Sequence, residues 1–221
     1  MPSFADKRTL IGLAWMNVVL HVLALILAFI GIRPGSPLVA LPERLSYLAS
    51  DPVGWSLGWA IWMVSALLLV AYFAALTRHL PDQRPLPQLA VIVAAAGAAV
   101  DLICNAIYFT ALPLLAAKTP PAEATFLAFE RAANALGLIV ANGLYSVGTL
   151  LLTMCMRQRP RWGRWATLVG YAVFGFGMIL VIAGFLNEPR LAALGTGPTI
   201  VFYCLWTILV ARSMNAKGIQ P

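Results

Sequence analysis

Six long apolar runs place the strongest constraint on what this chain can fold into. A helix needs roughly 20 apolar residues to cross a bilayer, and a lone strand could not satisfy its backbone hydrogen bonds in lipid. The chain is 61% hydrophobic and only 10% charged, far from the composition of a soluble domain. The sequence therefore predicts an all-α integral membrane protein, a single domain over residues 1–221 that forms a bundle of six transmembrane helices. The expected spans are residues 9–32, 55–77, 89–115, 132–156, 166–187 and 199–214.

The distribution of basic residues between the loops predicts the orientation of this bundle. Ten of the 15 Lys and Arg residues lie in the termini and in the loops on the same side as the termini. Loops rich in Lys and Arg stay in the cytoplasm, so both termini are expected to be cytoplasmic, with the bundle in the cell (inner) membrane. The five basic residues on the other side are Arg33, Arg44, Lys118, Arg131 and Arg190.

The net charge of +7 points to lipid and not to nucleic acid, because the basic residues flank apolar spans. Anionic headgroups on the cytoplasmic side are the expected partners of the loop that holds Arg157, Arg159, Arg161 and Arg164. The three cysteines lie inside apolar spans and form no disulfide framework. No metal site is expected, since one His and one Asp are too few ligands for zinc, and no cofactor is expected.

Polar residues on three of the spans are predicted to lie at a similar depth. Asp101 follows the start of the third span by about 18 Å of helix, which places it near the middle of the membrane. Asn105 and Tyr108 follow at i+4 and i+7 and share its helix face. His21 lies at a comparable depth in the first span, and Asn142 does so in the fourth.

A carboxylate at this depth needs compensation, because a charged group in the middle of a bilayer costs at least a few kcal/mol. Asp101 is therefore expected to face the bundle interior. It is then either protonated, hydrogen-bonded to Asn142 or a tyrosine, or paired with His21. One interpretation of the cluster is structural, a buried hydrogen-bond network that fixes the register of the helices. The other is a binding site formed by His21, Asp101, Asn105 and Asn142, with Tyr108, Tyr145 and Trp62 as its walls.

Three classes of function are compatible with these residues. The preferred hypothesis is an integral membrane protein that binds or passes a small apolar or amphiphilic molecule through the polar site, with a proton-linked variant. The second is a structural or accessory subunit that contacts a protein partner or a second copy of itself. The third is a lipid-phase enzyme in which His21 and Asp101 act as an acid–base pair, although no catalytic residue is assigned.

Two connections on the outer side are longer than tight turns. Residues 41–49 are predicted to form a short interfacial helix, and residues 119–134 an amphipathic extension of the fourth span with Thr119 as its N-cap. Both are expected to lie on the membrane surface, or else to cap an outward-facing cavity. Interface anchors are expected at Trp55, Trp59, Trp162 and Trp165.

The segments "RTLIGLAWMNVVLHVLALIL" and "RQRPRWGRWATLVGY", together with the alanine-rich third span, resemble bacterial six-helix inner-membrane proteins grouped as domains of unknown function. The resemblance implies the same helical architecture. It implies no activity and transfers no functional residue.

Overall fold

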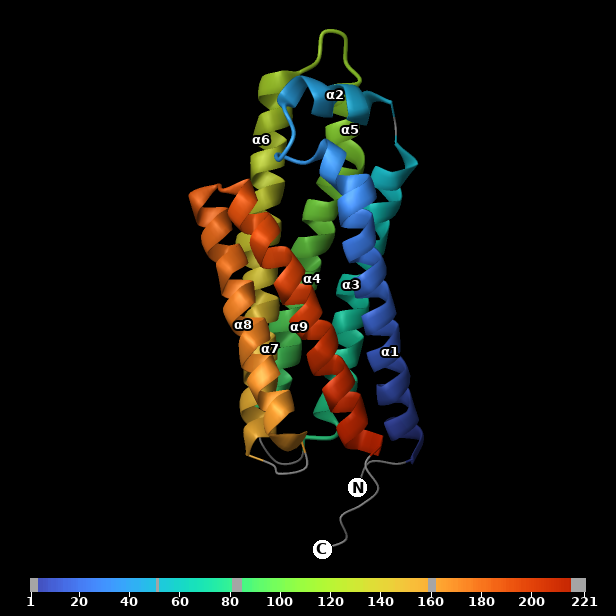
Figure 1. The fold of residues 1–221 in the computed structure, drawn as a ribbon, viewed down its shortest axis with the longest axis vertical. Coiled ribbons are helices and arrows are strands. Elements are labelled where there is room, and N and C mark those ends of the chain that lie inside the picture. The colour runs from blue at the N-terminus through green and yellow to red at the C-terminus, as the bar shows by residue number, and fades with distance from the viewer. Residues whose placement is uncertain (1–3, 51, 81–84, 159–161, 216–221) are drawn as a thin grey trace, which may run out of the picture.

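Six helices of the computed structural model are long and apolar enough to cross a membrane. The structure describes residues 4–50, 52–80, 85–158 and 162–215, and within them it is all-helical (Figure 1). The prediction of an all-α bundle with six spanning-length helices is thus confirmed. The six are Lys7–Gly35, Val53–Thr77, Leu86–Ala116, Glu123–Arg157, Gly163–Leu186 and Pro189–Met214.

Several of these long helices are composed of shorter elements that follow one another without a break. The elements are α1 Phe4–Leu27, η1 Ala28–Ile32, η2 Arg33–Gly35, α2 Leu41–Ala49, α3 Val53–Thr77, α4 Leu86–Ala106, η3 Ile107–Ala111, α5 Leu112–Ala116, α6 Glu123–Asn134, η4 Ala135–Ala141, α7 Asn142–Arg157, α8 Gly163–Leu186 and α9 Pro189–Asn215.

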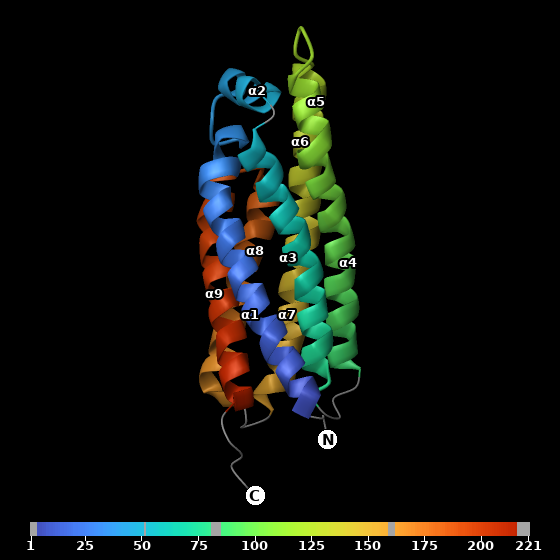
Figure 2. The same ribbon diagram turned by 90° about the vertical axis from the view of Figure 1, so that its right-hand side faces the viewer.

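The long helices form a closed ring in chain order. Each packs against the next, from α1 through α3, α4, α7 and α8 to α9, and α9 returns to pack against α1. The first helix begins and the last one ends at the same end of the bundle, and α2 lies across the opposite end (Figures 1 and 2). We call these the terminal end and the α2 end.

Three helices contain a π-helical segment near the α2 end: Ala28–Ile32, Ile107–Ala111 and Ala135–Ala141. A π turn shifts the backbone hydrogen bonds from i+4 to i+5 and inserts one extra residue. The first two segments each end two residues before a proline, Pro34 and Pro113. Because proline has no N–H to continue the helical ladder, these prolines explain why the regular helix is interrupted there.

The proline at 113 leaves a backbone carbonyl without its helical donor. The N–H of Leu112 donates to the carbonyl of Ile107, five residues earlier. The next bond in this pattern would join an N–H of residue 113 to the carbonyl of Tyr108, but Pro113 has no N–H. The indole Nε1 of Trp55 on α3 donates to that carbonyl instead, at 2.8 Å. Trp55 is 1% exposed, so the prediction that it anchors the protein at the membrane interface is wrong.

The α9 helix begins ten residues before the predicted sixth span. Asn187 adopts a left-handed conformation after α8, and the N–H groups of Asn187 and Glu188 close the helix end on the carbonyls of Gly184 and Ala183. The α9 helix then starts at Pro189, where a proline is tolerated, and continues through Pro198. Pro198 therefore lies within a helix and does not form a turn before the sixth span.

Glycines at a seven-residue spacing allow α7 and α8 to pack closely. A side chain at Gly170, Gly177 or Gly184 would collide with residues of α7 or η4. Gly175, which lies between them on another face of α8, borders open space. The spacing keeps the small residues on one helix face, which permits close approach of the backbones.

The two long connections at the α2 end contact each other. The short helix occupies Leu41–Ala49 as predicted, and it packs against α5. The amphipathic extension is also present as α6, with Phe126, Glu130 and Ala133 on its buried face. However, α6 begins at Glu123 after Ala122, without a side-chain cap, so the proposed N-cap at Thr119 is wrong.

The terminal half of the bundle is filled by side chains. Tyr72, Phe73 and Trp206 are fully buried there, with their ring centroids 6.0 to 6.3 Å apart. Trp162 belongs to the same core and is 2% exposed, which contradicts its predicted role as an interface anchor. This packed region closes the bundle toward the terminal end.

Candidate binding cavity

A cavity of about 350 Å³ lies inside the ring of helices and extends toward the α2 end. All six long helices contribute to its wall. The volume falls within the range of small-molecule pockets in proteins, about 300–1,000 Å³. The residues predicted to form a site all line this cavity: His21, Trp62, Asp101, Asn105, Tyr108, Asn142 and Tyr145.

Asp101 lies on the inner face of α4, and its carboxylate receives hydrogen bonds from two uncharged groups. The hydroxyl of Tyr145 on α7 donates to Oδ2 at 3.2 Å, and the thiol of Cys104 lies 3.5 Å from Oδ1. The tyrosine contact is one of the alternatives that the sequence left open, whereas pairing with His21 or Asn142 is not what the structure shows. Ala96, Ala99 and Ala106, on the opposite face of the helix, are exposed.

His21 is held by its own helix and by aromatic neighbours. Its Nδ1 lies 2.9 Å from the carbonyl of Asn17. A carbonyl can only accept, so Nδ1 carries the hydrogen, and in the neutral ring Nε2 is the acceptor. The imidazole packs against Tyr203 with a centroid distance of 4.7 Å and meets the edge of Trp62 at 6.5 Å. These contacts give His21 a fixed tautomer and no direct bond to Asp101.

Asn105 and Trp59 each bury an N–H group that lacks a partner among the described residues. The two groups are Asn105 Nδ2 and Trp59 Nε1. Asn105 Nδ2 lies beside the Asp101 carboxylate but does not meet the geometry of a hydrogen bond. A buried donor left unpaired costs about 1–3 kcal/mol, so such groups call for an explanation. Both residues line the cavity, with the two N–H groups buried within its wall.

Tyr108 connects the cavity wall to α6. Its ring stacks on Trp59 at a centroid distance of 4.0 Å, and its hydroxyl donates to Asn134 Oδ1 at 2.7 Å. Asn142 lines the cavity and also makes a hydrogen bond within its own helix. Its Nδ2 donates to the carbonyl of Gly137 at 2.8 Å and so supports the π segment in its own helix.

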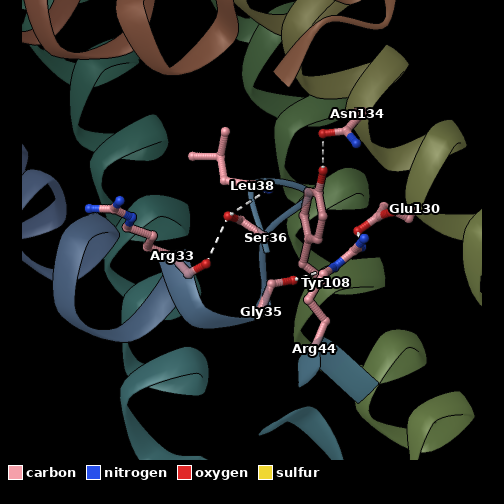
Figure 3. A network of polar contacts seen from close by, with 8 residues as sticks. All are labelled: Arg33, Gly35, Ser36, Leu38, Arg44, Tyr108, Glu130 and Asn134. Carbon is pink, nitrogen blue, oxygen red and sulfur yellow. Dashed lines mark hydrogen bonds and ion pairs between the residues drawn. The ribbon is translucent and has the colours of Figure 1, made fainter. Parts of the chain in front are cut away.

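A buried ion pair lies between the cavity and the α2 end. Arg44 of α2 contacts Glu130 of α6, and the side chain of each is 6% exposed. The guanidinium also lies over the ring of Phe126, at 5.5 Å from its centroid. Figure 3 shows this pair beside the contact between Tyr108 and Asn134, which is one helical turn from Glu130. Burial lowers the pKa of the Arg44 guanidinium, because leaving water disfavours its charged form.

The lining of the cavity reaches exposed residues in the segment that follows η1 and in the turn that joins α8 to α9. They are Arg33, Leu38, Asn187 and Glu188, and we call this region the mouth of the cavity. The α8–α9 turn ends below α2, α5 and α6 in Figure 1, so the rim of the ring is lower on that side. Arg33 and Glu188 are both exposed, so their charges lie at the edge of the cavity and not in its interior.

Two of the four arginines expected to contact lipid headgroups, Arg157 and Arg164, lie at the terminal end, away from the cavity. Arg157 and Arg164 are exposed, and Arg164 lies over the ring of Trp165 at 5.3 Å. Arg159 and Arg161 lie outside the described residues. Among the residues that the structure describes, no three His, Cys, Asp or Glu side chains converge on a possible metal position.

Sequence reasoning missed several residues that shape this site. Tyr203 donates to Asn17 Oδ1 at 3.0 Å from the opposite end of the chain, and only the depth of both residues hints at this contact. Trp59 lies about one helical turn before the predicted residue Trp62, and Cys104 lies about one turn after the predicted residue Asp101. Arg44 and Glu130 are read from sequence as loop charges, because nothing local marks them as buried partners.

Comparisons with protein-family models, with curated proteins and with solved structures gave no match for this chain. The functional argument therefore rests on the geometry of the cavity.

Proposed function

We propose that this multi-pass membrane protein binds a small amphiphilic molecule in the cavity enclosed by its helices. The observation that carries the proposal is the carboxylate of Asp101, which is presented to a cavity whose walls are otherwise mostly apolar and aromatic. Ligand pockets have this composition, an apolar enclosure with a few placed polar groups. The unpaired N–H groups of Asn105 and Trp59 support the same conclusion.

The shape of the cavity favours binding over passage. The packed core around Tyr72, Phe73 and Trp206 lies between the cavity and the terminal end, so a molecule entering at the mouth meets a closed floor. Transport would need this aromatic layer to separate. The acid–base pair proposed as a third alternative has no geometric support, since His21 and Asp101 bind other partners.

We further propose that both termini are cytoplasmic in the cell membrane and that the mouth of the cavity faces outward. The ten-to-five distribution of Lys and Arg supports this orientation. It would place Arg157 and Arg164 at the cytoplasmic headgroups, where each basic residue contributes about 1 kcal/mol of attraction to anionic lipid.

Benzylacetone, a neutral ketone with one aromatic ring, is a suitable probe for the cavity. Gly197 of α9 lines the cavity, and a Cβ atom there would meet nothing within 4 Å. The Gly197→Phe variant should therefore fill part of the cavity without disturbing the helix. We expect it to weaken benzylacetone binding at least about tenfold, equivalent to 1.4 kcal/mol. Binding is measured by quenching of tryptophan fluorescence and by thermal stabilisation in a nonionic detergent.

Gly175→Phe is the matched control. Gly175 also borders open space and lies in a helix, but it does not line the cavity. It should bind benzylacetone as the wild type does. Equal binding by the wild type and by both variants would show that the ketone partitions into the detergent or onto the surface, and the proposal would fail.

A further inference from the structure

We infer that the cavity selects a protonated amine, whose ammonium group pairs with the carboxylate of Asp101 while aromatic rings surround it. This inference rests on the proposed function and specifies the class of ligand. It follows from the distribution of charge inside the ring of helices, which the following observations establish.

Asp101 is the only carboxylate among the described residues in the interior of the cavity, and it has no cationic partner there. Its hydrogen-bond donors are the hydroxyl of Tyr145 and the thiol of Cys104, both uncharged. The ion pair found among the described residues joins Arg44 to Glu130, outside the cavity wall. A buried carboxylate is normally paired or coordinated, so the position opposite Asp101 is suited to a positive charge.

The other ionisable groups of the cavity wall do not fill this position. His21 directs Nδ1 to the carbonyl of Asn17 and packs its ring between Tyr203 and Trp62. Arg33 and Glu188 are exposed at the mouth. Among the described residues, the interior therefore carries one carboxyl group that no cationic side chain of the chain pairs with.

The aromatic residues of the wall match the same ligand. Tyrosine and tryptophan attract cations to their ring faces, and the attraction grows to about 2 kcal/mol or more when water is excluded. The cavity is lined by Trp59, Trp62, Tyr108, Tyr145 and Tyr203. An aromatic enclosure around one carboxylate is suited to a cation with an apolar body. It disfavours an anion, which Asp101 would repel.

The unpaired N–H groups add a second element to the ligand. Asn105 follows Asp101 by one helical turn, lines the cavity and lies beside the carboxylate. Its Nδ2 is buried in the wall, and a rotation of the side chain would bring it to an acceptor near the ammonium group. An amine that carries an oxygen a few bonds from its nitrogen would satisfy both Asp101 and Asn105. An amine without the oxygen would satisfy Asp101 alone.

The test compares benzylacetone with its amine analogue, in which a primary amine replaces the carbonyl on the same carbon skeleton. The amine is protonated at neutral pH, since alkyl ammonium groups titrate near pH 10. A charge-assisted pair favours the amine over the ketone by about 10- to 100-fold in affinity. In the Asp101→Asn variant, this preference should disappear, while benzylacetone binding is retained as evidence that the variant is folded.

Glu43→Gln is the control for the loss of one negative charge, because Glu43 is exposed on α2. It should preserve the preference for the amine. Equal affinities of the wild type for amine and ketone would overturn the inference, even if Asp101→Asn cannot be purified. If benzylacetone binds in a way that depends on Gly197 but the amine is not preferred, the proposed function stands and the inference fails. If neither probe binds, both fail.

Discussion

Arg44 and Glu130 come from segments 86 positions apart, yet the two side chains meet away from water. The desolvation of two charges is offset only when their mutual geometry is good and other groups complete the shell. Arg44 also has the carbonyl of Gly35 and the ring of Phe126 as neighbours. The pair therefore joins α2 to α6 in one defined position.

Removing one member of this pair should destabilise the protein much more than removing both. We expect Glu130→Gln to lower the free energy of unfolding by about 3–5 kcal/mol, because it leaves a buried guanidinium without its partner. The double variant Arg44→Met/Glu130→Leu should recover most of that loss. Unfolding is followed by titration with a denaturing detergent in mixed micelles. Additive losses in the double variant would mean that the two residues act independently.

The residues of the cavity were partly predictable, because depth along a helix follows from a constant rise per residue. That rise brought His21, Asp101 and Asn142 to one level. It could not specify which of them touch, since contact depends on the rotation of each helix about its axis. Hence Tyr145, and not His21, proved to be the partner of Asp101.

At the scale of the helices, each predicted span falls on one of the long helices, although the sixth helix begins ten residues earlier than predicted. The π segments within the helices were not predicted. Apolar length is a strong local signal, and it is read directly from the sequence. A π turn is a small shift in backbone hydrogen bonding, and a carbonyl that loses its helical donor there is bonded by a residue far away in the sequence. One example is the indole N–H of Trp55, which donates to the carbonyl of Tyr108. Pro113, two residues after the segment, is the one local sign of it.

A double-mutant cycle tests the link between this proline and the indole. Trp55→Phe should destabilise the protein by about 1–3 kcal/mol in the wild-type background, because the Tyr108 carbonyl loses its donor. Pro113→Ala restores a backbone N–H to the helix. In that background, the loss caused by Trp55→Phe should be smaller by roughly 1 kcal/mol, within the range of coupling between residues that share a partner. Equal losses in both backgrounds would contradict the link.

At the scale of the whole molecule, the orientation in the membrane decides which side of the membrane the mouth of the cavity faces. The three native cysteines are buried, so new cysteines can be labelled against a low background. Ser46→Cys on α2 should react with an impermeant reagent added outside intact cells, and Gln158→Cys should not. Both residues are exposed in the structure. Labelling of Gln158→Cys alone would reverse the orientation and turn the mouth of the cavity toward the cytoplasm.

The hydrogen bond from Tyr203 to Asn17 closes the ring between the first long helix and the last. Asn17 is fully buried, and two other bonds hold its Nδ2 on the carbonyls of Leu13 and Leu68. During synthesis those two partners exist early, but the donor for Oδ1 is made 186 residues later. The cavity thus acquires its final wall only when translation reaches α9. Until then, the wall of the cavity is incomplete, and Oδ1 of Asn17 lacks the donor that Tyr203 later supplies.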